Sequence, residues 1–259
     1  MDLKLKDKVI IVTGGSKGIG NGICNLLAKE GAIAVIVGRN KPNVLDAVKA
    51  IKDNGGQAFH AFAELTDKEA CKKAIDNVIK EFGRIDGLVN NAGVNDGIGL
   101  ENGNYDDFMV SIQRNVAHYY AMVHYALPEL KKSKGAIVNI GSKTSFTGQG
   151  GTSGYAAANG ARNALTREWA VELLPFSIRV NAVIVAECYT PLYKRWLDTF
   201  PNPEEKLNGI TKHIPLENRM TTATEIANAV AFLLSETSSH TTGQLLFVDG
   251  GYTHLDRSI

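Results

Sequence analysis

The fold of this chain is decided at the stretch Thr13-Gly14-Gly15-Ser16-Lys17-Gly18-Ile19-Gly20. It follows the apolar run Val9–Thr13 and opens the helix-like segment Ile19–Glu30, so it is expected to join a strand to a helix. Gly14 permits a tight turn, Gly18 lets the backbone approach a phosphate, and Gly20 allows close helix–strand packing. Free N–H groups and the positive end of the helix dipole then face the phosphate. The stretch predicts a dinucleotide site, and we expect Ser16, Lys17 and Ile19 to line it as well.

Short β-branched runs alternate with helix-like segments along the chain. Most runs are apolar throughout, as expected for strands buried on both faces of a parallel sheet. The expected strands are Val9–Thr13, Ala34–Gly38, Ala58–Ala61, Gly87–Asn90, Ala136–Gly141, Arg179–Ile184 and Leu245–Val248. The expected helices are Ile19–Glu30, Asn43–Asn54, Asp67–Phe82, Asp106–Lys131, Gly154–Leu174 and Thr224–Ser235. Thr224 and Ala227, three residues later, form no capping box. The alternation predicts an α/β fold with a single domain over residues 1–259: a Rossmann-type doubly wound sheet of seven parallel strands flanked by helices.

The segment Ala186–Pro215 is the one long region that matches neither sheet nor sheet-covering helix. It is rich in proline and aromatic residues, and it follows a strand end, where open α/β sheets bind ligands. We expect a substrate lid over residues 186–215. Trp196, Tyr189 and Tyr193 are expected either to stack on the substrate or to fill the lid.

Composition excludes several classes of partner. Lys and Arg number 28 and Asp and Glu 27, so the net charge of +1 gives no field for nucleic acid or an acidic membrane. Cys24, Cys71 and Cys188 are far apart, without a C-x-x-C motif or a nearby His cluster, so neither a disulfide framework nor a metal site is expected. No apolar run approaches the roughly 20 residues of a membrane span, and the charged start of Met1–Val12 is unlike a signal peptide. We expect a cytoplasmic protein.

The second expected strand ends at Gly38-Arg39-Asn40, where the adenosine ribose would be recognised. An acidic side chain there would bind the 2′-hydroxyl of NAD and repel a 2′-phosphate. The guanidinium of Arg39 instead suits a phosphate. We expect NADP as the cofactor. NAD remains possible, because Arg39 could instead be a solvated surface residue.

Taken together, these motifs resemble those of the short-chain dehydrogenase/reductase family. The loop Thr13–Gly20 matches the family's T-G-x-x-x-G-I-G pattern, and Asn90-Asn91-Ala92-Gly93 matches its motif after the fourth strand. The resemblance implies that Asn91, Ala92 and Gly93 line the adenine side of the cofactor pocket. It also implies that Glu64 and Leu65 stand where the family reads adenine, although the family residue is usually aspartate. Val185 and Thr190 would lie beside the nicotinamide.

Asn115, Ser142 and Tyr155 stand at the family's catalytic positions. The resemblance implies that Tyr155 is the acid/base, that Ser142 holds the substrate oxygen, and that Asn115 kinks its helix and anchors a water. The stretch Tyr155-Ala156-Ala157-Ala158-Asn159 departs from the family pattern Tyr-x-x-x-Lys, because Asn159 replaces the lysine. Asn159 could still bind the nicotinamide ribose and the water held by Asn115.

The replaced lysine matters because free tyrosine has a pKa near ~10 and is almost entirely un-ionised at neutral pH. A lysine about 4–5 Å away, at an effective dielectric near 20, would favour the phenolate by roughly 3–4 kcal/mol. Lys143 could supply a cation, although neighbouring residues on a strand point to opposite faces. The charge of the oxidised nicotinamide offers partial compensation. We expect catalysis slowed by about 10²–10³-fold, or moved to alkaline pH.

Within the family, several segments are similar to the sugar dehydrogenases that oxidise L-fucose: 95–100, 142–150, 186–193 and the tail 250–257. This implies oxidation of an aldose at its anomeric carbon to the lactone, with Ser142, Gln149, Tyr155, Glu187 and Trp196 contacting the sugar. Family members pair through helices like Asp106–Lys131 and Gly154–Leu174, which implies a homotetramer. His118 and His124 are expected in the core or an interface. A cofactor-binding protein with little turnover, from natural or engineered loss of the lysine, is the alternative.

Overall fold

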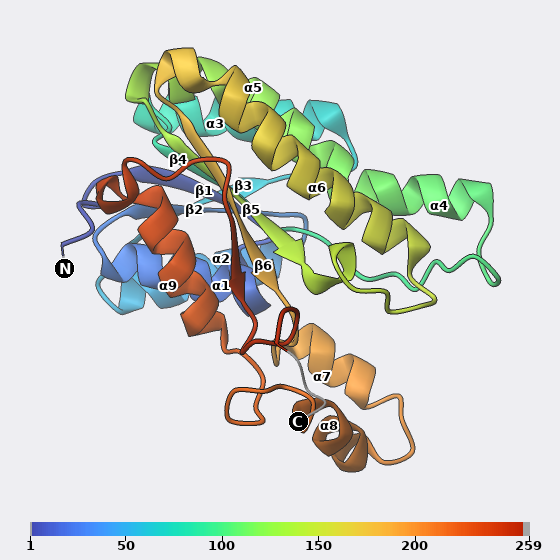
Figure 1. The fold of residues 1–259 in the computed structure, drawn as a ribbon. Coiled ribbons are helices and arrows are strands. Elements are labelled where there is room, and N and C mark those ends of the chain that lie inside the picture. The colour runs from blue at the N-terminus through green and yellow to red at the C-terminus, as the bar shows by residue number, and fades with distance from the viewer. Residues whose placement is uncertain (1, 256–259) are drawn as a thin grey trace.

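Seven parallel strands form one sheet in the computed structural model, which describes residues 2–255. The spatial order is β3-β2-β1-β4-β5-β6-β7, and each neighbouring pair runs parallel (Figure 1). The strands are β1 Val9–Thr13, β2 Ile33–Gly38, β3 Gln57–Phe62, β4 Gly87–Asn90, β5 Ala136–Ser142, β6 Arg179–Val185 and β7 Leu245–Val248. The expected fold class is confirmed. Asp256 and Arg257, at the end of the tail quoted for the resemblance, lie outside the described residues.

The sheet is buried on both faces because its central strands carry apolar side chains at successive positions. Every residue of β1, β4 and β5 is buried. The chain winds outward from β1 to β3, then returns to the other side of β1 to form β4. The strand order therefore reverses at β1 and β4, and open α/β sheets bind ligands at the carboxyl ends of the strands beside such a reversal.

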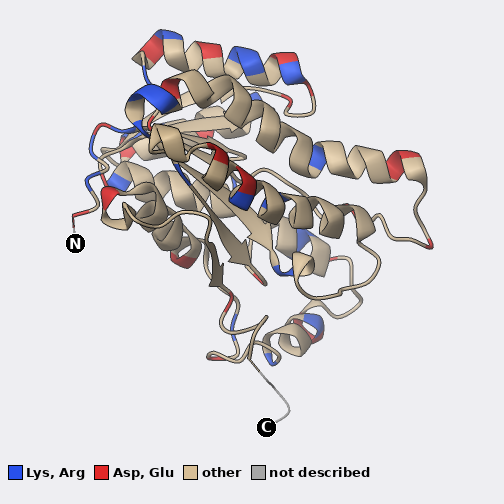
Figure 2. Ribbon diagram, turned by 45° about the horizontal axis from the view of Figure 1, so that its top comes forward, with Lys and Arg blue, Asp and Glu red and all other residues tan. Residues whose placement is uncertain are grey.

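Helices cover the two faces of the sheet in separate layers (Figure 1). Packed against one face are α1 Gly18–Lys29, α2 Lys41–Asp53 and α9 Ala223–Leu234. Packed against the other are α3 Lys68–Phe82, α5 His118–Ser133 and α6 Ser153–Glu172. Two apolar cores lie between the sheet and these layers. Figure 2 shows positive and negative residues interspersed along the outer helices.

The long helix expected over Asp106–Lys131 is interrupted. The structure has α4 Tyr105–Ile112, a π-helical turn η1 Gln113–Ala117, and then α5. Within the turn, Asn115 Nδ2 donates to the carbonyl oxygen of Ser111 at 3.0 Å, and its Oδ1 accepts from the N–H of Val94 at 2.8 Å. The side chain therefore bonds to a distant loop as well as to its own helix, and such π turns concentrate at functional sites.

The start of the last helix also differs from expectation. Thr222, two residues before the expected start at Thr224, is the N-cap of α9 and forms a capping box with Glu225. The Glu225 N–H donates to Thr222 Oγ1 at 3.2 Å, and the Thr222 N–H donates to Glu225 Oε2 at 2.8 Å. The reciprocal bonds satisfy two otherwise free backbone donors, which fixes the helix start.

Two short helices occupy the expected lid segment: α7 Pro191–Leu197 and α8 Pro203–Thr211. Each begins with proline after a polar cap, Thr190 for α7 and Asn202 for α8. In Figure 1 they stand apart from the two helical layers, beyond the end of β6. Among residues 2–255, no helix combines the length and apolar character needed to cross a membrane.

Candidate active site

The glycine-rich loop turns from β1 directly into α1. Gly14 and Gly18 have φ angles of 66° and 56°, in the left-handed region that favours glycine. A Cβ on Gly20 would collide with the backbone oxygen of Gly14 and lie 2.6 Å from Asn91 Nδ2. Helix, loop and the segment after β4 therefore meet with no room for a side chain at position 20.

The amino end of α1 has free backbone donors. Its N-cap, Lys17, makes no side-chain capping bond, and its first turn contains no acidic residue. The N–H groups there suit an external anion, which the helix dipole also favours. Ser16, Ile19 and the loop glycines share this end of the helix. The loop thus fits the pyrophosphate of a nicotinamide dinucleotide.

The segment after β4 is tied to the glycine-rich loop through Thr13. The N–H groups of Asn91 and Ala92 both donate to Thr13 Oγ1, at 2.9 and 3.1 Å, and Asn91 Nδ2 donates to the Thr13 carbonyl oxygen at 2.8 Å. Gly93 follows, where a Cβ would lie 2.7 Å from Arg162 Nη2. The segment expected on the adenine side is therefore fixed between the glycine-rich loop and α6.

Arg39 and Glu64, expected separately to read the ribose phosphate and the adenine, bind each other. Arg39 Nη1 lies 3.0 Å from Glu64 Oε2, with the side chains 77% and 45% exposed. Burial acts to raise the pKa of Glu64, but hydrogen bonds from Arg39 and Thr66 outweigh it and lower that pKa. Leu65, the other residue expected here, is half-buried and accepts a bond from Cys71 Sγ at its carbonyl oxygen. A phosphate binding to Arg39 must compete with Glu64.

Ser142 and Tyr155 come from neighbouring elements. Ser142 ends β5 and is buried, and its Oγ accepts from the backbone N–H and the hydroxyl of Thr144 at 3.3 and 3.1 Å. Tyr155 lies in the first turn of α6 and is half-buried. One turn later, Asn159 Nδ2 donates to the Tyr155 carbonyl oxygen at 2.9 Å. Asn159 therefore binds its own helix through one end of its amide.

The other end of the Asn159 amide accepts from a residue that the sequence analysis missed. Arg162 Nη1 donates to Asn159 Oδ1 and to the Ile140 carbonyl oxygen, each at 3.1 Å. Its Nε donates to the Asn115 carbonyl oxygen at 2.7 Å, and Nη2 donates to the same oxygen. Arg162 is 3% exposed. Spacing could have identified it, since residues 155, 159 and 162 share one helix face.

Lys143 is buried but its charge is paired. It lies in η2, one turn of 3₁₀ helix over Lys143–Ser145 that follows β5, rather than in a strand. Its Nζ forms an ion pair with the Glu187 carboxylate and lies 3.9 Å from the centroid of the Tyr252 ring. The Lys143 and Glu187 side chains are only 9% and 13% exposed. Lys143 is thus engaged by Glu187, which weakens it as a substitute for the lysine absent at position 159.

Tyr193 of the lid donates a hydrogen bond to the ion pair between Lys143 and Glu187. Tyr193 Oη donates to Glu187 Oε2 at 2.7 Å, and burial, followed by the nearby Glu187 charge, raises the pKa of Tyr193. Trp196 is 43% exposed and packs edge-on against Tyr193 and Phe200, with centroids 5.2 and 5.0 Å apart. Trp196 therefore packs within the lid and still presents part of its ring to solvent.

The other expected site residues occupy varied settings. Thr190 Oγ1 caps α7 at the N–H of Tyr193, and its Cγ2 lies 3.3 Å from a Cβ placed on Gly18, so the lid begins beside the glycine-rich loop. Val185 is buried at the end of β6, while Gln149 is exposed in the loop before α6. His118 is buried and His124 exposed. Burial, followed by the Arg162 charge, lowers the pKa of His118 to about 3.

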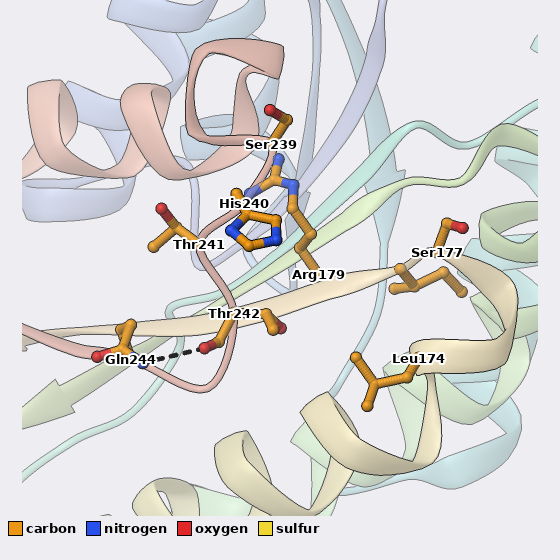
Figure 3. Close-up of a pocket in the computed structure, with 9 residues that line it drawn as sticks. Leu174, Ser177, Arg179, Ser239, His240, Thr241, Thr242 and Gln244 are labelled. Atoms are coloured by element: carbon orange, nitrogen blue, oxygen red, sulfur yellow. Dashed lines mark hydrogen bonds between the residues drawn. The ribbon is translucent and has the colours of Figure 1, made fainter.

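An open cleft of about 580 Å³ lies at the amino-terminal ends of β6 and β7, the end of the sheet opposite the candidate active site (Figure 3). Arg179 projects into it at the start of β6, beside His240 and Thr242 (Figure 3). Its guanidinium bonds to the carbonyl oxygens of Leu233, Leu234 and Ser235 at the end of α9. Because ligands bind parallel sheets at the carboxyl ends of strands, this cleft is separate from the candidate active site.

Within the described part of the chain, no cluster of three or more His, Cys, Asp or Glu side chains is placed to hold a metal ion.

Comparison with protein families gives a match over residues 14–253 to a family described as Enoyl-(Acyl carrier protein) reductase. Cyclopentanol dehydrogenase of Comamonas sp. (strain NCIMB 9872) is 34% identical over 251 residues, covering 96% of this chain and 98% of that protein. L-fucose dehydrogenase of Bos taurus is 31% identical over 252 residues, covering 97% and 91%.

Solved structures with the same fold include three that bear on the site. Cj0485 dehydrogenase is 48% identical with a TM-score of 0.96, covering 100% of this chain and 99% of that chain. Ligand-free aldohexose dehydrogenase of Thermoplasma acidophilum is 30% identical with a TM-score of 0.89, covering 100% and 98%. L-sorbose reductase of Gluconobacter frateurii, complexed with NADPH and L-sorbose, is 25% identical with a TM-score of 0.94, covering 99% and 100%.

Proposed function

Because the chain belongs to the short-chain dehydrogenase/reductase family, we propose that it is a nicotinamide-dependent dehydrogenase that oxidises an L-fucose-like aldose to its lactone. The family membership supports an oxidoreductase. We propose in addition that the substrate is a sugar and that NADP is preferred to NAD.

The observation that carries the sugar assignment is the buried ion pair between Lys143 and Glu187. It lies in the turn directly after Ser142, and Tyr193 of the lid donates to it. Buried charges are costly unless they have polar partners, so a substrate cavity shaped around this pair favours a ligand rich in hydroxyl groups. A purely lipophilic substrate would leave the pair in contact with apolar atoms.

The proposed chemistry divides between the bound cofactor and the side chains of α6 and β5. A bound oxidised nicotinamide would supply the hydride acceptor for oxidation of the anomeric carbon. Tyr155, as phenolate, takes the proton of the anomeric hydroxyl, and Ser142 donates to the same oxygen and so orients it. The free donors at the start of α1 would hold the pyrophosphate. Glu187, with Gln149 and Trp196, would contact the remaining hydroxyls.

The relatives support this substrate class only in part. L-fucose dehydrogenase and aldohexose dehydrogenase act on aldoses by name, whereas cyclopentanol dehydrogenase acts on an alicyclic alcohol. The NADPH complex of L-sorbose reductase supports a nicotinamide cofactor. Arg39 supports NADP over NAD, because its guanidinium suits the 2′-phosphate.

Formation of reduced cofactor, followed by its absorbance, tests the proposal. The substrates are L-fucose, other aldohexoses and aldopentoses, and cyclopentanol, each with NAD and with NADP across pH. We expect the highest kcat/KM for an aldose. Oxidation of cyclopentanol alone, with no aldose turned over, would contradict the sugar assignment while leaving the dehydrogenase intact.

A second candidate function is a cofactor-binding protein with little turnover. Asn159 favours it, because the site lacks the lysine that the family places there. Stoichiometric binding of NADP or NAD in calorimetry, with no reduced cofactor formed from any substrate at any pH, would support this candidate over the dehydrogenase.

We propose further that the protein is a cytoplasmic homotetramer. Helices α4, α5 and α6 carry exposed large apolar side chains: Tyr105, Met109, Val110, Tyr120 and Val171. Exposed apolar surface on these helices is available to a subunit interface. Sedimentation equilibrium of the purified protein tests the assembly, and a mass equal to one chain at micromolar concentration would contradict it.

A further inference from the structure

Arg162 is a buried cation without a carboxylate partner. Its guanidinium donates to two backbone carbonyl oxygens, of Asn115 and Ile140, and to the amide oxygen of Asn159. It stacks on Tyr119, with Cζ 4.4 Å from the ring centroid. No Asp or Glu among residues 2–255 forms an ion pair with it. A buried charge of this kind favours the appearance of a negative charge nearby.

Tyr155 is the group beside it that can acquire such a charge. Arg162 Cζ lies 6.0 Å from the centroid of the Tyr155 ring, two helical turns back along α6. The bridge between them is Asn159, which donates to the Tyr155 backbone and accepts from Arg162. The position of the absent lysine is therefore connected directly to a guanidinium.

Building on the function proposed above, we propose that Arg162 is a positioning residue that stabilises the Tyr155 phenolate in place of the lysine absent at position 159. Arginine stays protonated at every working pH, so its charge does not depend on the protonation of its neighbours. It acts on the proton transfer through Tyr155 and does not itself contact the reacting atoms.

The close approach of Gly93 to Arg162 shows that the guanidinium is tightly packed. A Cβ at this position would lie 2.7 Å from Arg162 Nη2 and 3.0 Å from Asn115 Oδ1. The segment after β4, the π turn η1 and helix α6 thus enclose the guanidinium together. A charge held rigidly in a low-dielectric setting acts on a neighbour more strongly than a mobile surface charge.

Other titratable groups facing Tyr155 and Arg162 are neutral or paired. Burial raises the pKa of Tyr119 to about 12, and burial lowers that of His118 to about 3. Lys143 is paired with Glu187. Asp96, in the loop before α4, pairs with Arg114 of η1, and Asp106 and Asp107 of α4 are exposed to solvent, which screens their charges. Arg162 is thus the cation near Tyr155 that no carboxylate neutralises within the described residues.

The test measures the ionisation of Tyr155 in two independent ways. One is the pH–rate profile of aldose oxidation. The other is the tyrosinate absorbance of the cofactor-free protein titrated with base, from which the same titration of Tyr155→Phe is subtracted. At the observed separation and an effective dielectric near 20, Arg162→Gln should raise both midpoints by roughly one to two pH units and lower neutral-pH turnover by about 10–100-fold. Arg162→Lys should keep both midpoints near those of the parent.

A substitution at position 159 gives a second, independent test. If Arg162 already supplies the charge, Asn159→Lys alone should raise neutral-pH turnover by less than about 10-fold, whereas in the Arg162→Gln background it should raise turnover by about 10²-fold. A gain of about 10²-fold from Asn159→Lys alone would overturn the proposal. So would unchanged midpoints in Arg162→Gln, or equal shifts in Arg162→Gln and Arg162→Lys.

Arg179→Gln is the matched control. Arg179 also binds backbone carbonyl oxygens at a helix end, but at the opposite edge of the sheet. Its substitution should lower stability and leave both midpoints in place; an equal midpoint shift would overturn the proposal by showing a general effect of destabilisation. If no substrate is oxidised at any pH, the proposed function fails, while the absorbance titration still decides whether Arg162 acts on Tyr155.

Discussion

Arg39 Nη1 lies 3.0 Å from Glu64 Oε2, just beyond the carboxyl ends of β2 and β3. The pair is largely exposed, and exposed ion pairs contribute at most about 1 kcal/mol to stability. The pair matters more for cofactor binding, because Glu64 occupies the Arg39 N–H donors that the 2′-phosphate of NADP would use. A carboxylate at this position also repels that phosphate.

We predict that Arg39→Ala weakens NADP binding by about 10–100-fold and NAD binding little, since charge-assisted hydrogen bonds to phosphate are lost. Glu64→Gln should act in the opposite direction, tightening NADP by a few-fold because the repelling charge is removed. Calorimetric dissociation constants of both cofactors for the parent and the two variants check this. Equal affinities for NAD and NADP, with a ratio unchanged in Arg39→Ala, would show that Arg39 does not select the phosphate.

Gly20→Ala should abolish cofactor binding. The new Cβ would meet the Gly14 backbone oxygen and Asn91 Nδ2, neither of which can move without opening the loop. Dissociation constants should rise by at least about 10²-fold for both cofactors, because the phosphate-binding backbone is displaced. Gly160→Ala is the control: no atom lies within 4 Å of its Cβ position, and alanine should stabilise α6 by about 0.5–1 kcal/mol. Normal cofactor affinity in Gly20→Ala would contradict the predicted site.

His118 should make the protein sensitive to acid. Its folded-state pKa of about 3 lies below the ordinary value of 6.5, so the unfolded chain binds the proton more readily. Stability contributed by the neutral ring is complete above pH 6.5 and is lost as pH falls from there towards 3. The expected slope is about 1.4 kcal/mol per pH unit from this residue alone.

Urea unfolding from neutral pH down to about pH 4 measures that slope. His118→Gln, which keeps a polar group able to bond with the Arg114 carbonyl oxygen, should unfold with a smaller pH dependence than the parent. Parallel stability curves for the two proteins would show that His118 does not titrate on unfolding.

The capping box of α9 gives a stability prediction with an internal control. Thr222→Ala should cost about 1 kcal/mol of unfolding free energy, because the Glu225 N–H loses its acceptor. Thr224→Ala, the same substitution within the first turn, should change stability by no more than about 0.5 kcal/mol. The hydrogen bond from Arg219, followed by the bond from the Thr222 N–H, lowers the pKa of Glu225 to about 2, so the box should persist as pH falls through 4.5 and fail only towards 2. Equal losses in the two alanine variants would contradict the assigned cap.

The α9 cap also shows what the sequence could and could not predict. Strand positions followed from unbroken apolar runs, and their expected ends agree with the structure within a residue or two. Thr222 and Glu225 had the capping-box spacing, yet the helix was expected to start at Thr224 because apolar periodicity locates a helix better than its ends. The signal was present in the sequence, and the start was misplaced by one residue, with the N-cap Thr222 one residue further back.

Parts of the site depended on contacts that no local pattern contains. Arg162 meets the Asn115 carbonyl oxygen across 47 residues of chain, and Lys143 meets Glu187 across 44. The resemblance implied a kink at Asn115, but not the bond that its side chain accepts there from the N–H of Val94, in a separate loop. Motif spacing could identify Ser142, Tyr155 and the glycine-rich loop, but the charge balance around Tyr155 required the tertiary structure.

The final prediction concerns Glu187 and the Tyr193 hydroxyl that donates to it at 2.7 Å. If Glu187 accepts hydrogen bonds from the sugar, Glu187→Gln should raise the KM for L-fucose or a related aldose by about 10-fold, since a charged acceptor is replaced by a neutral one. Turnover at saturation should fall less, because Glu187 does not contact the reacting oxygen. Tyr193→Phe should have a smaller effect in the same direction, because it removes only the bond that orients the carboxylate.

Steady-state kinetics of both variants check this, with cyclopentanol as the comparison substrate. The KM for cyclopentanol should change little in either variant, because it has one hydroxyl, which Ser142 and Tyr155 engage. Glu187→Gln also removes the ion pair with Lys143, so thermal unfolding of each variant is measured alongside. A KM that rises equally for the aldose and for cyclopentanol would mean that Glu187 supports the lid and the turn Lys143–Ser145. Other residues would then recognise the sugar.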